Sequence, residues 1–110
     1  MALFGRGTTP YLPIYAEGVD LTGAHVYVTI KQNATRLIKD GADVTFVGYD
    51  SQTDTSELAV SYTQQETLGL ADGAAELQIR WIYSDGTAQE SDIAQITIGR
   101  VLQGGVIVYA

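Results

Sequence analysis

An alternation of apolar and polar side chains from Glu76 to Tyr83 constrains the fold more than any other feature of the chain. Leu77, Ile79 and Trp81 occupy every second position, and polar residues stand between them. A period of two puts the large side chains on one face of a strand, which is typical of a half-buried β-strand. This segment is therefore expected to be a core strand, with Trp81 inside the protein rather than on an exposed sugar-binding platform.

A hairpin turn follows that strand at Asp85-Gly86. Glycine adopts the positive φ of a tight turn without steric cost, so the chain is expected to reverse here. It would return through Ile93, Ile96 and Ile98. Because Ile93 is out of phase with the other two isoleucines, we predict a β-bulge near residues 94–95.

Further strand signals recur along the chain, with turn residues between them. β-branched or alternating segments lie at 12–15, 24–32, 36–40, 44–49 and 58–62. Pro10 and Pro13 restrict the first of these to a sheet edge, where a missing N–H does no harm. Signals at spacings of roughly 8 to 12 residues predict an all-β fold, an Ig-like antiparallel β-sandwich of about seven or eight strands.

One short helical turn is expected near residues 64–68. Thr63-Gln64-Gln65-Glu66 fits the capping box, in which the threonine hydroxyl and the glutamate carboxylate each accept a backbone N–H of the other residue. Gly69 or Gly73 would end the helix. The helix would then bridge two sheets.

Composition limits what the chain can bind. The 110 residues suit one domain, 1–110, and the net charge of −7 argues against nucleic acid as a partner. No apolar run approaches the roughly 20 residues of a membrane span, so no membrane partner is expected. Only 17% of residues are charged and seven are tyrosines. Interfaces are rich in tyrosine and poor in charge, which favours a subunit covered by neighbouring chains.

The two ends of the chain are the predicted partner surfaces. The N-terminal arm, 1–10, mixes Gly, Thr and Pro, and the C-terminal tail, 100–110, is apolar around Gly104-Gly105 and has no charge after Arg100. A strand-forming, uncharged tail is aggregation-prone unless a partner covers it. The alternative is that the tail folds back as a final edge strand of its own domain. The predicted interface residues are Leu3, Phe4, Arg6, Val101, Leu102, Val106, Ile107, Val108 and Tyr109.

Candidate catalytic and metal-binding groups are few. His25 is the only histidine, and no GxSxG nucleophile motif is present, so no enzyme activity and no catalytic residue is predicted. Asp40, Asp43, Asp50 and Asp54 crowd two loops, as Ca²⁺ ligands sometimes do. Their spacing misses the EF-hand pattern, and aspartate is common in solvated turns, so neither a metal nor a cofactor is predicted.

Several segments together resemble a known group of proteins. These are RGTTPYLPI at 6–14, VYVTIKQ at 26–32, LAVSYTQQETLGL at 58–70, LQIRWIYSDGTAQES at 77–91 and VLQGGVI at 101–107. In their order and spacing they resemble small tail and baseplate proteins of tailed bacteriophages and prophages of Gram-positive hosts, and are similar to the N-terminal sandwich domain of upper baseplate proteins.

This resemblance implies a structural subunit of a virion, made in the host cytoplasm and placed in the tail or baseplate. Its partners would be other phage structural proteins, and it would be present as a homo-oligomer or in many copies. The alternative is a capsid decoration protein or a carbohydrate-binding adhesion module on the phage surface.

Overall fold

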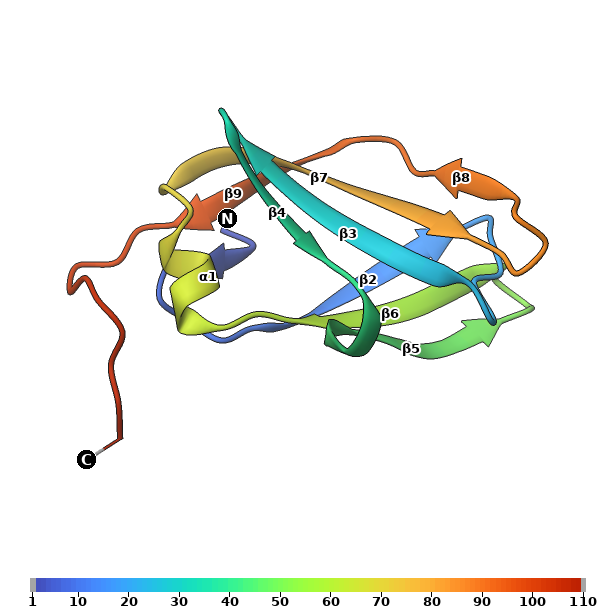
Figure 1. Ribbon diagram of the computed structural model, residues 1–110, viewed down its shortest axis with the longest axis horizontal. Helices are drawn as coiled ribbons and strands as arrows, with labels where there is room; N and C mark the ends of the chain where they lie inside the picture. Colours follow the sequence, from blue (N-terminus) through green and yellow to red (C-terminus); the bar gives the residue numbers. More distant parts are fainter. Residues whose placement is uncertain (1, 110) are drawn as a thin grey trace.

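The computed structural model describes residues 2–109, which form two β-sheets and one short helix (Figure 1). Met1 and Ala110, the outermost residues of the predicted arm and tail, lie outside the described residues. The six-stranded sheet has the order β1 (Phe4–Gly5), β9 (Ala94–Gly99), β7 (Gly73–Ile82), β3 (His25–Gln32) and β4 (Thr35–Lys39), with β8 (Ala88–Glu90) also paired to β7. The three-stranded sheet has the order β2 (Tyr11–Glu17), β6 (Thr55–Ser61) and β5 (Val44–Asp50). The 3-10 turn η1 (Gly41–Asp43) and helix α1 (Gln64–Leu68) complete the described elements.

The all-β prediction is confirmed, but two of its details were wrong. Nine strands are present within residues 2–109, rather than seven or eight, since the arm adds β1 and the returning strand of the hairpin is split into β8 and β9. The sheets are also not wholly antiparallel. β1 lies parallel to β9, with Phe4 opposite Ile98.

The predicted hairpin is the centre of the large sheet. β7 pairs with β3 on one side and with β8 and β9 on the other, and Gly86 in the turn has a φ of 90°. The predicted bulge near 94–95 was wrong, because the returning strand is interrupted at 91–93 instead. There Ser91 takes the place of a ladder pair, since its N–H donates to the Ile79 carbonyl at 2.9 Å and its hydroxyl accepts the Ile79 N–H at 3.1 Å. Ile93 is left exposed.

The core lies between the two sheets and follows the predicted alternation. Trp81 is only 6% exposed, which confirms its expected place inside. Its indole N–H still finds a partner in the Gln89 side-chain oxygen, at 3.2 Å. The largest apolar side chains of the core are Phe4, Leu12, Leu21, Val26, Val28, Ile30, Leu58, Val60, Tyr62, Leu70, Ile79, Trp81 and Ile98.

Helix α1 connects β6 of the small sheet to β7 of the large one, and its predicted cap is confirmed. The Thr63 hydroxyl accepts the Glu66 N–H at 3.2 Å, and the Glu66 carboxylate accepts the Thr63 N–H at 2.9 Å. The helix ends at Gly69, one of the two glycines expected to end it.

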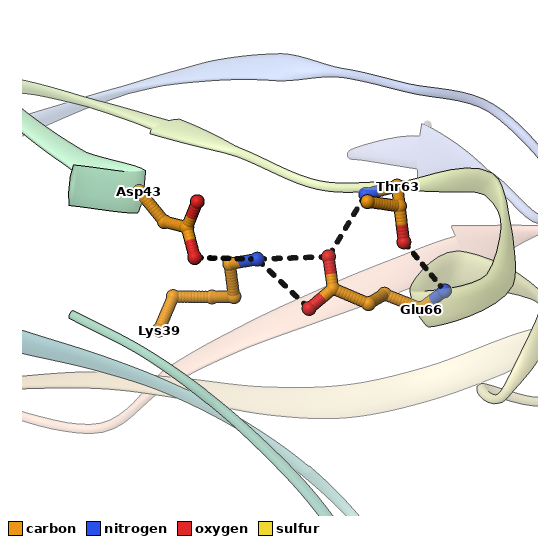
Figure 2. A network of polar contacts seen from close by, with 4 residues as sticks. All are labelled: Lys39, Asp43, Thr63 and Glu66. Atoms are coloured by element: carbon orange, nitrogen blue, oxygen red, sulfur yellow. Dashed lines mark hydrogen bonds and ion pairs between the residues drawn. The ribbon is translucent and has the colours of Figure 1, made fainter. Parts of the chain in front are cut away.

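Glu66 also neutralises an inward-pointing lysine, as Figure 2 shows. The Lys39 ammonium donates to both Glu66 oxygens at 2.8 Å and lies 3.2 Å from Asp43. Burial lowers the pKa of Lys39, but the bonds to Glu66 and Asp43 outweigh it and raise that pKa above its ordinary value. Burial raises the pKa of Glu66, and the bonds from Lys39 and Thr63 outweigh it and lower the pKa. These contacts connect Lys39, at the end of β4, and Asp43 of η1 to Glu66 of α1.

Candidate functional site

The C-terminal tail leaves the large sheet after β9 and projects from the body of the domain (Figure 1). Residues 101–109 form no strand, so the alternative prediction of a final edge strand was wrong for this segment. Leu102, Val108 and Tyr109 are 90%, 83% and 104% exposed, and Val106 and Ile107 are also exposed. Of the predicted interface residues in the tail, Val101 alone is half-buried.

One side chain holds the tail beside the helix. The Gln64 amide donates to the Ile107 carbonyl and its oxygen accepts the Ile107 N–H, both at 2.8 Å. This paired exchange has the same donors and acceptors as one step of an antiparallel ladder. Gly105, two residues earlier, has a φ of 88°, a conformation that glycine adopts readily. Both backbone groups of Ile107 are thus hydrogen-bonded, as they would be in a β-strand, while the rest of the tail projects from the domain.

In the N-terminal arm, part of the predicted interface was wrong. Phe4 is 7% exposed, and its ring centroid lies 5.6 Å from that of Tyr62 in the core. Phe4 is therefore a core residue and not an exposed partner contact. The reason is the open edge of β9, which pairs with β1 and draws this aromatic side chain inward. Leu3 remains partly exposed beside it.

Arg6 is also occupied within its own domain. Its guanidinium donates to the main-chain carbonyls of Leu68 and Leu70, at the end of α1 and just beyond it. Carbonyls at the end of a helix lack intrahelical partners and attract a cation, which explains why the arm folds back here. We expected a partner chain to contact Phe4 and Arg6, but both side chains contact residues of their own domain.

A groove of about 800 Å³ opens between the edge of β2 and the strands β7 and β8. Its apolar wall comes from Ile14, Ala16, Leu77, Ile79 and Trp81, and its rim carries the carboxylates Glu17, Glu90 and Asp92. The groove exists because the three-stranded sheet is narrower than the six-stranded sheet that it faces.

Along this opening, no strand within residues 2–109 pairs with the outer edge of β2. Gly18 donates to the Asp54 carbonyl and the Tyr62 N–H donates to the Pro10 carbonyl, so the even-numbered residues of this segment bond toward β6. By the alternation of an antiparallel ladder, the odd-numbered residues direct their N–H and C=O groups to the other edge. Pro13, which has no N–H, occupies one of these odd positions. At the groove the outward-facing residues are Tyr15 and Glu17.

A second surface, the outer face of the large sheet, brings two cations and one carboxylate together. Lys31 of β3 lies opposite Arg36 of β4 on one side and opposite Glu76 of β7 on the other, and Arg80 lies farther along the same face. Like charges placed opposite each other across strands destabilise a sheet. This grouping could not be predicted from the sequence, because Lys31, Arg36 and Glu76 become neighbours only once the register of β3, β4 and β7 is known.

The aspartates of the two loops act as local hydrogen-bond acceptors, as turn residues do. Each accepts from a nearby group: Asp40 from His25, Asp43 from Lys39, Asp50 from the Gln52 N–H and Asp54 from the Tyr49 hydroxyl. Asp40 and His25, 3.0 Å apart, are both about half exposed. Within residues 2–109, no cluster of three or more His, Asp or Glu side chains is arranged to hold a metal ion.

None of the described helices has the length and apolar character needed to cross a membrane. No protein-family model matches the chain, and no significant match was found among curated proteins or among solved structures.

Proposed function

We propose that this chain is a structural subunit of a bacteriophage virion, in the tail or baseplate, and that it acts by protein–protein assembly. The observation that carries the proposal is the apolar tail at 101–109, which projects from the domain with most of its large side chains exposed. The sequence resemblance to tail and baseplate proteins gives the setting. In this proposal the body is an Ig-like sandwich, and its partners are other phage structural proteins and further copies of itself.

The tail gains free energy from any partner that covers it. Full burial of one Val, Leu or Ile side chain stabilises an assembly by roughly 1.5 to 3 kcal/mol before ordering costs. Leu102, Val106, Ile107 and Val108 are all exposed and available for this. Many identical copies in one particle add such contacts through a high effective concentration.

Deletion of residues 105–110 tests the proposal. Residues 105–109, the described part of this segment, contribute nothing to the core, so the shortened protein is expected to keep its melting temperature and to be lost from purified particles. The matched control is Thr45→Ser, an exposed change on β5 that is expected to leave incorporation intact. A shortened protein that still enters particles, or one that unfolds, contradicts the proposal. Electron microscopy of intact particles would then show where the chain lies.

A second candidate function, binding of a surface carbohydrate by a decoration or adhesion module, is favoured by two exposed tyrosines. Tyr11 and Tyr15 are each 62% exposed on β2, and Tyr15 lies at the acidic rim of the groove. Exposed aromatic rings suit stacking on sugars. Titration of the protein with purified host wall polysaccharide is expected to show binding that Tyr15→Ala abolishes. Binding that persists in this variant excludes the groove as the sugar site.

A further inference from the structure

We propose that the groove along β2 of one copy receives the C-terminal tail of a second copy as an added β-strand. The inference rests on the proposed function, in which the tail drives assembly, and it names the surface that accepts it. Strand addition of this kind uses backbone hydrogen bonds for affinity and pockets for alternate side chains for fit.

The acceptor site has both parts that strand addition needs. The small sheet ends at β2, and among the described residues no strand pairs with its outer edge. Tyr15 and Glu17 direct their N–H and C=O groups to that edge, by the ladder alternation established above. The half-buried side chains of Ile14 and Leu77 supply apolar surface in the wall of the same groove. A fourth strand would widen the small sheet and cover this wall.

The tail has the matching chemistry. Val106 and Val108 share one face of an extended segment, and Ile107 and Tyr109 share the other, so either face offers two large side chains to the groove. Arg100 is the only charged residue between 100 and 109. Its positive charge complements the acidic rim of the groove, at Glu17, Glu90 and Asp92.

Geometry favours a second copy over the tail's own groove. Gly73, the first residue of β7, pairs with Ile98, so the tail leaves the sheet beside the start of β7. The groove wall begins at Leu77, about 13 Å along that strand, and reaches Trp81, roughly 26 Å away at about 3.3 Å per residue. The tail is meanwhile held at Gln64 and runs away from β2 and β8, the strands that border the groove (Figure 1). To lie along the whole wall of its own groove, the tail would have to reverse direction and use nearly all of its extended length of about 30 Å.

Transfer of the tail to a second copy would replace its hydrogen bonds to Gln64 by hydrogen bonds of the same type. The Gln64 amide pairs with both backbone groups of Ile107, and the edge of β2 offers the same donor and acceptor types. Leaving Gln64 for the groove therefore loses no class of hydrogen bond and adds burial of the tail side chains. A head-to-tail contact of this kind builds rings if the rotation closes, and filaments if it does not.

Disulfide trapping between two full-length variants tests the pairing, because the natural chain has no cysteine. A Val108→Cys protein is mixed under mild oxidation with a heavy-isotope-labelled Ala94→Cys protein, in which the change lies on the groove wall. The hetero-dimer is identified by its mass. The matched control replaces the second protein by Thr45→Cys, an exposed position on β5 outside the groove. We expect at least tenfold more hetero-dimer with Ala94→Cys. Equal yields, or no hetero-dimer, overturn the proposal.

Proline at an outward position of β2 provides a second test that keeps the fold. Pro13 already occupies such a position, so Tyr15→Pro removes an outward N–H at the groove without breaking a bond to β6. In the Val108→Cys and Ala94→Cys pair it is expected to lower the hetero-dimer yield roughly fivefold, the effect of one lost hydrogen bond. Tyr11→Pro, outside the groove, is the control. A yield that Tyr15→Pro leaves unchanged overturns strand addition.

The two proposals fail in different ways. If deletion of 105–110 abolishes incorporation into particles but Ala94→Cys is never trapped, the tail drives assembly and its acceptor lies on another protein. If trapping succeeds and the parent chain is absent from purified particles, strand exchange between copies stands and the virion role falls.

Discussion

The ammonium of Lys39 lies 2.8 Å from both carboxylate oxygens of Glu66, the residue that also caps helix α1. One carboxylate therefore satisfies an inward-pointing cation and a helix N–H at the same time. Lys39 is 5% exposed, so its charge depends on this partner. Two structural elements that are distant in sequence are stabilised by a single side chain.

Glu66→Gln is expected to lower the free energy of unfolding by about 1.5 to 3 kcal/mol, the range for hydrogen bonds to charged groups, because it leaves a buried ammonium with Asp43 as its remaining charged partner. Urea unfolding followed by Trp81 fluorescence measures this. Asp72→Asn, which neutralises an exposed carboxylate, is the control and is expected to change stability by less than about 0.5 kcal/mol. Equal effects of the two changes would contradict the dual role of Glu66.

Stability should depend on pH through the same pair. Glu66 has a pKa lowered from 4.5, so its contribution is present above pH 4.5 and is lost as the pH falls through the lower folded value. Lys39 has a pKa raised from 10.5, so its contribution is present below pH 10.5 and is lost as the pH rises through the higher folded value.

The difference in unfolding free energy between the parent and Glu66→Gln should therefore be constant between about pH 5 and 10 and should shrink at lower pH. Unfolding curves of both proteins across this range measure it. Asp20 and Asp85 also have lowered pKa values, owing to hydrogen bonds from Thr22 and Thr87, but both proteins share them and their effects cancel. A difference that grows in acid would show that Glu66 is not held ionised by Lys39.

Tyr62→Phe is expected to leave stability unchanged or to raise it by up to about 1 kcal/mol. The Tyr62 hydroxyl is buried and has no hydrogen-bond partner among residues 2–109, so its removal takes away an unsatisfied polar group. Tyr83→Phe is the matched control, because the Tyr83 hydroxyl donates to the Asp20 carbonyl at 2.8 Å. That change should cost about 1 kcal/mol. Calorimetric melting of both variants distinguishes them, and a marked loss in Tyr62→Phe would reveal a partner for this hydroxyl.

Phe4→Ala should destabilise the isolated protein by about 3 to 5 kcal/mol, the usual cost of emptying an aromatic core site. The matched change Leu3→Ala, at a partly exposed neighbour, should cost less than about 1 kcal/mol. Thermal melting of the two purified proteins provides the comparison. If Phe4→Ala melts like the parent but fails to assemble, the arm is a partner surface after all.

The sequence predicted the features that depend on neighbouring residues. Trp81 lies inside because its strand keeps a period of two, and the Thr63–Glu66 cap forms because both partners lie within one turn. These signals are local, so they survive without knowledge of the fold. They also explain why β3 and the hairpin turn were expected where they occur.

Features that depend on pairing between distant segments could not be predicted. Nothing in the sequence around Phe4 indicates that β9 leaves an open edge with which it can pair. The sequence around Lys39 likewise does not indicate that its ammonium contacts Glu66. The groove has the same origin, since it arises from the unequal widths of two sheets. The exposed tail was expected because it lacks charge, but its bond to Gln64 joins segments that are far apart in sequence.

The pairing of Phe4 with Ile98 has a consequence for how the chain is made. Almost the whole sequence separates these residues, and contacts so distant in sequence close late in folding. During synthesis the first strand must wait until β9 has left the ribosome, and the exposed apolar tail emerges directly behind β9. A nascent chain therefore completes its large sheet at nearly the same moment as the apolar side chains of the tail first meet water.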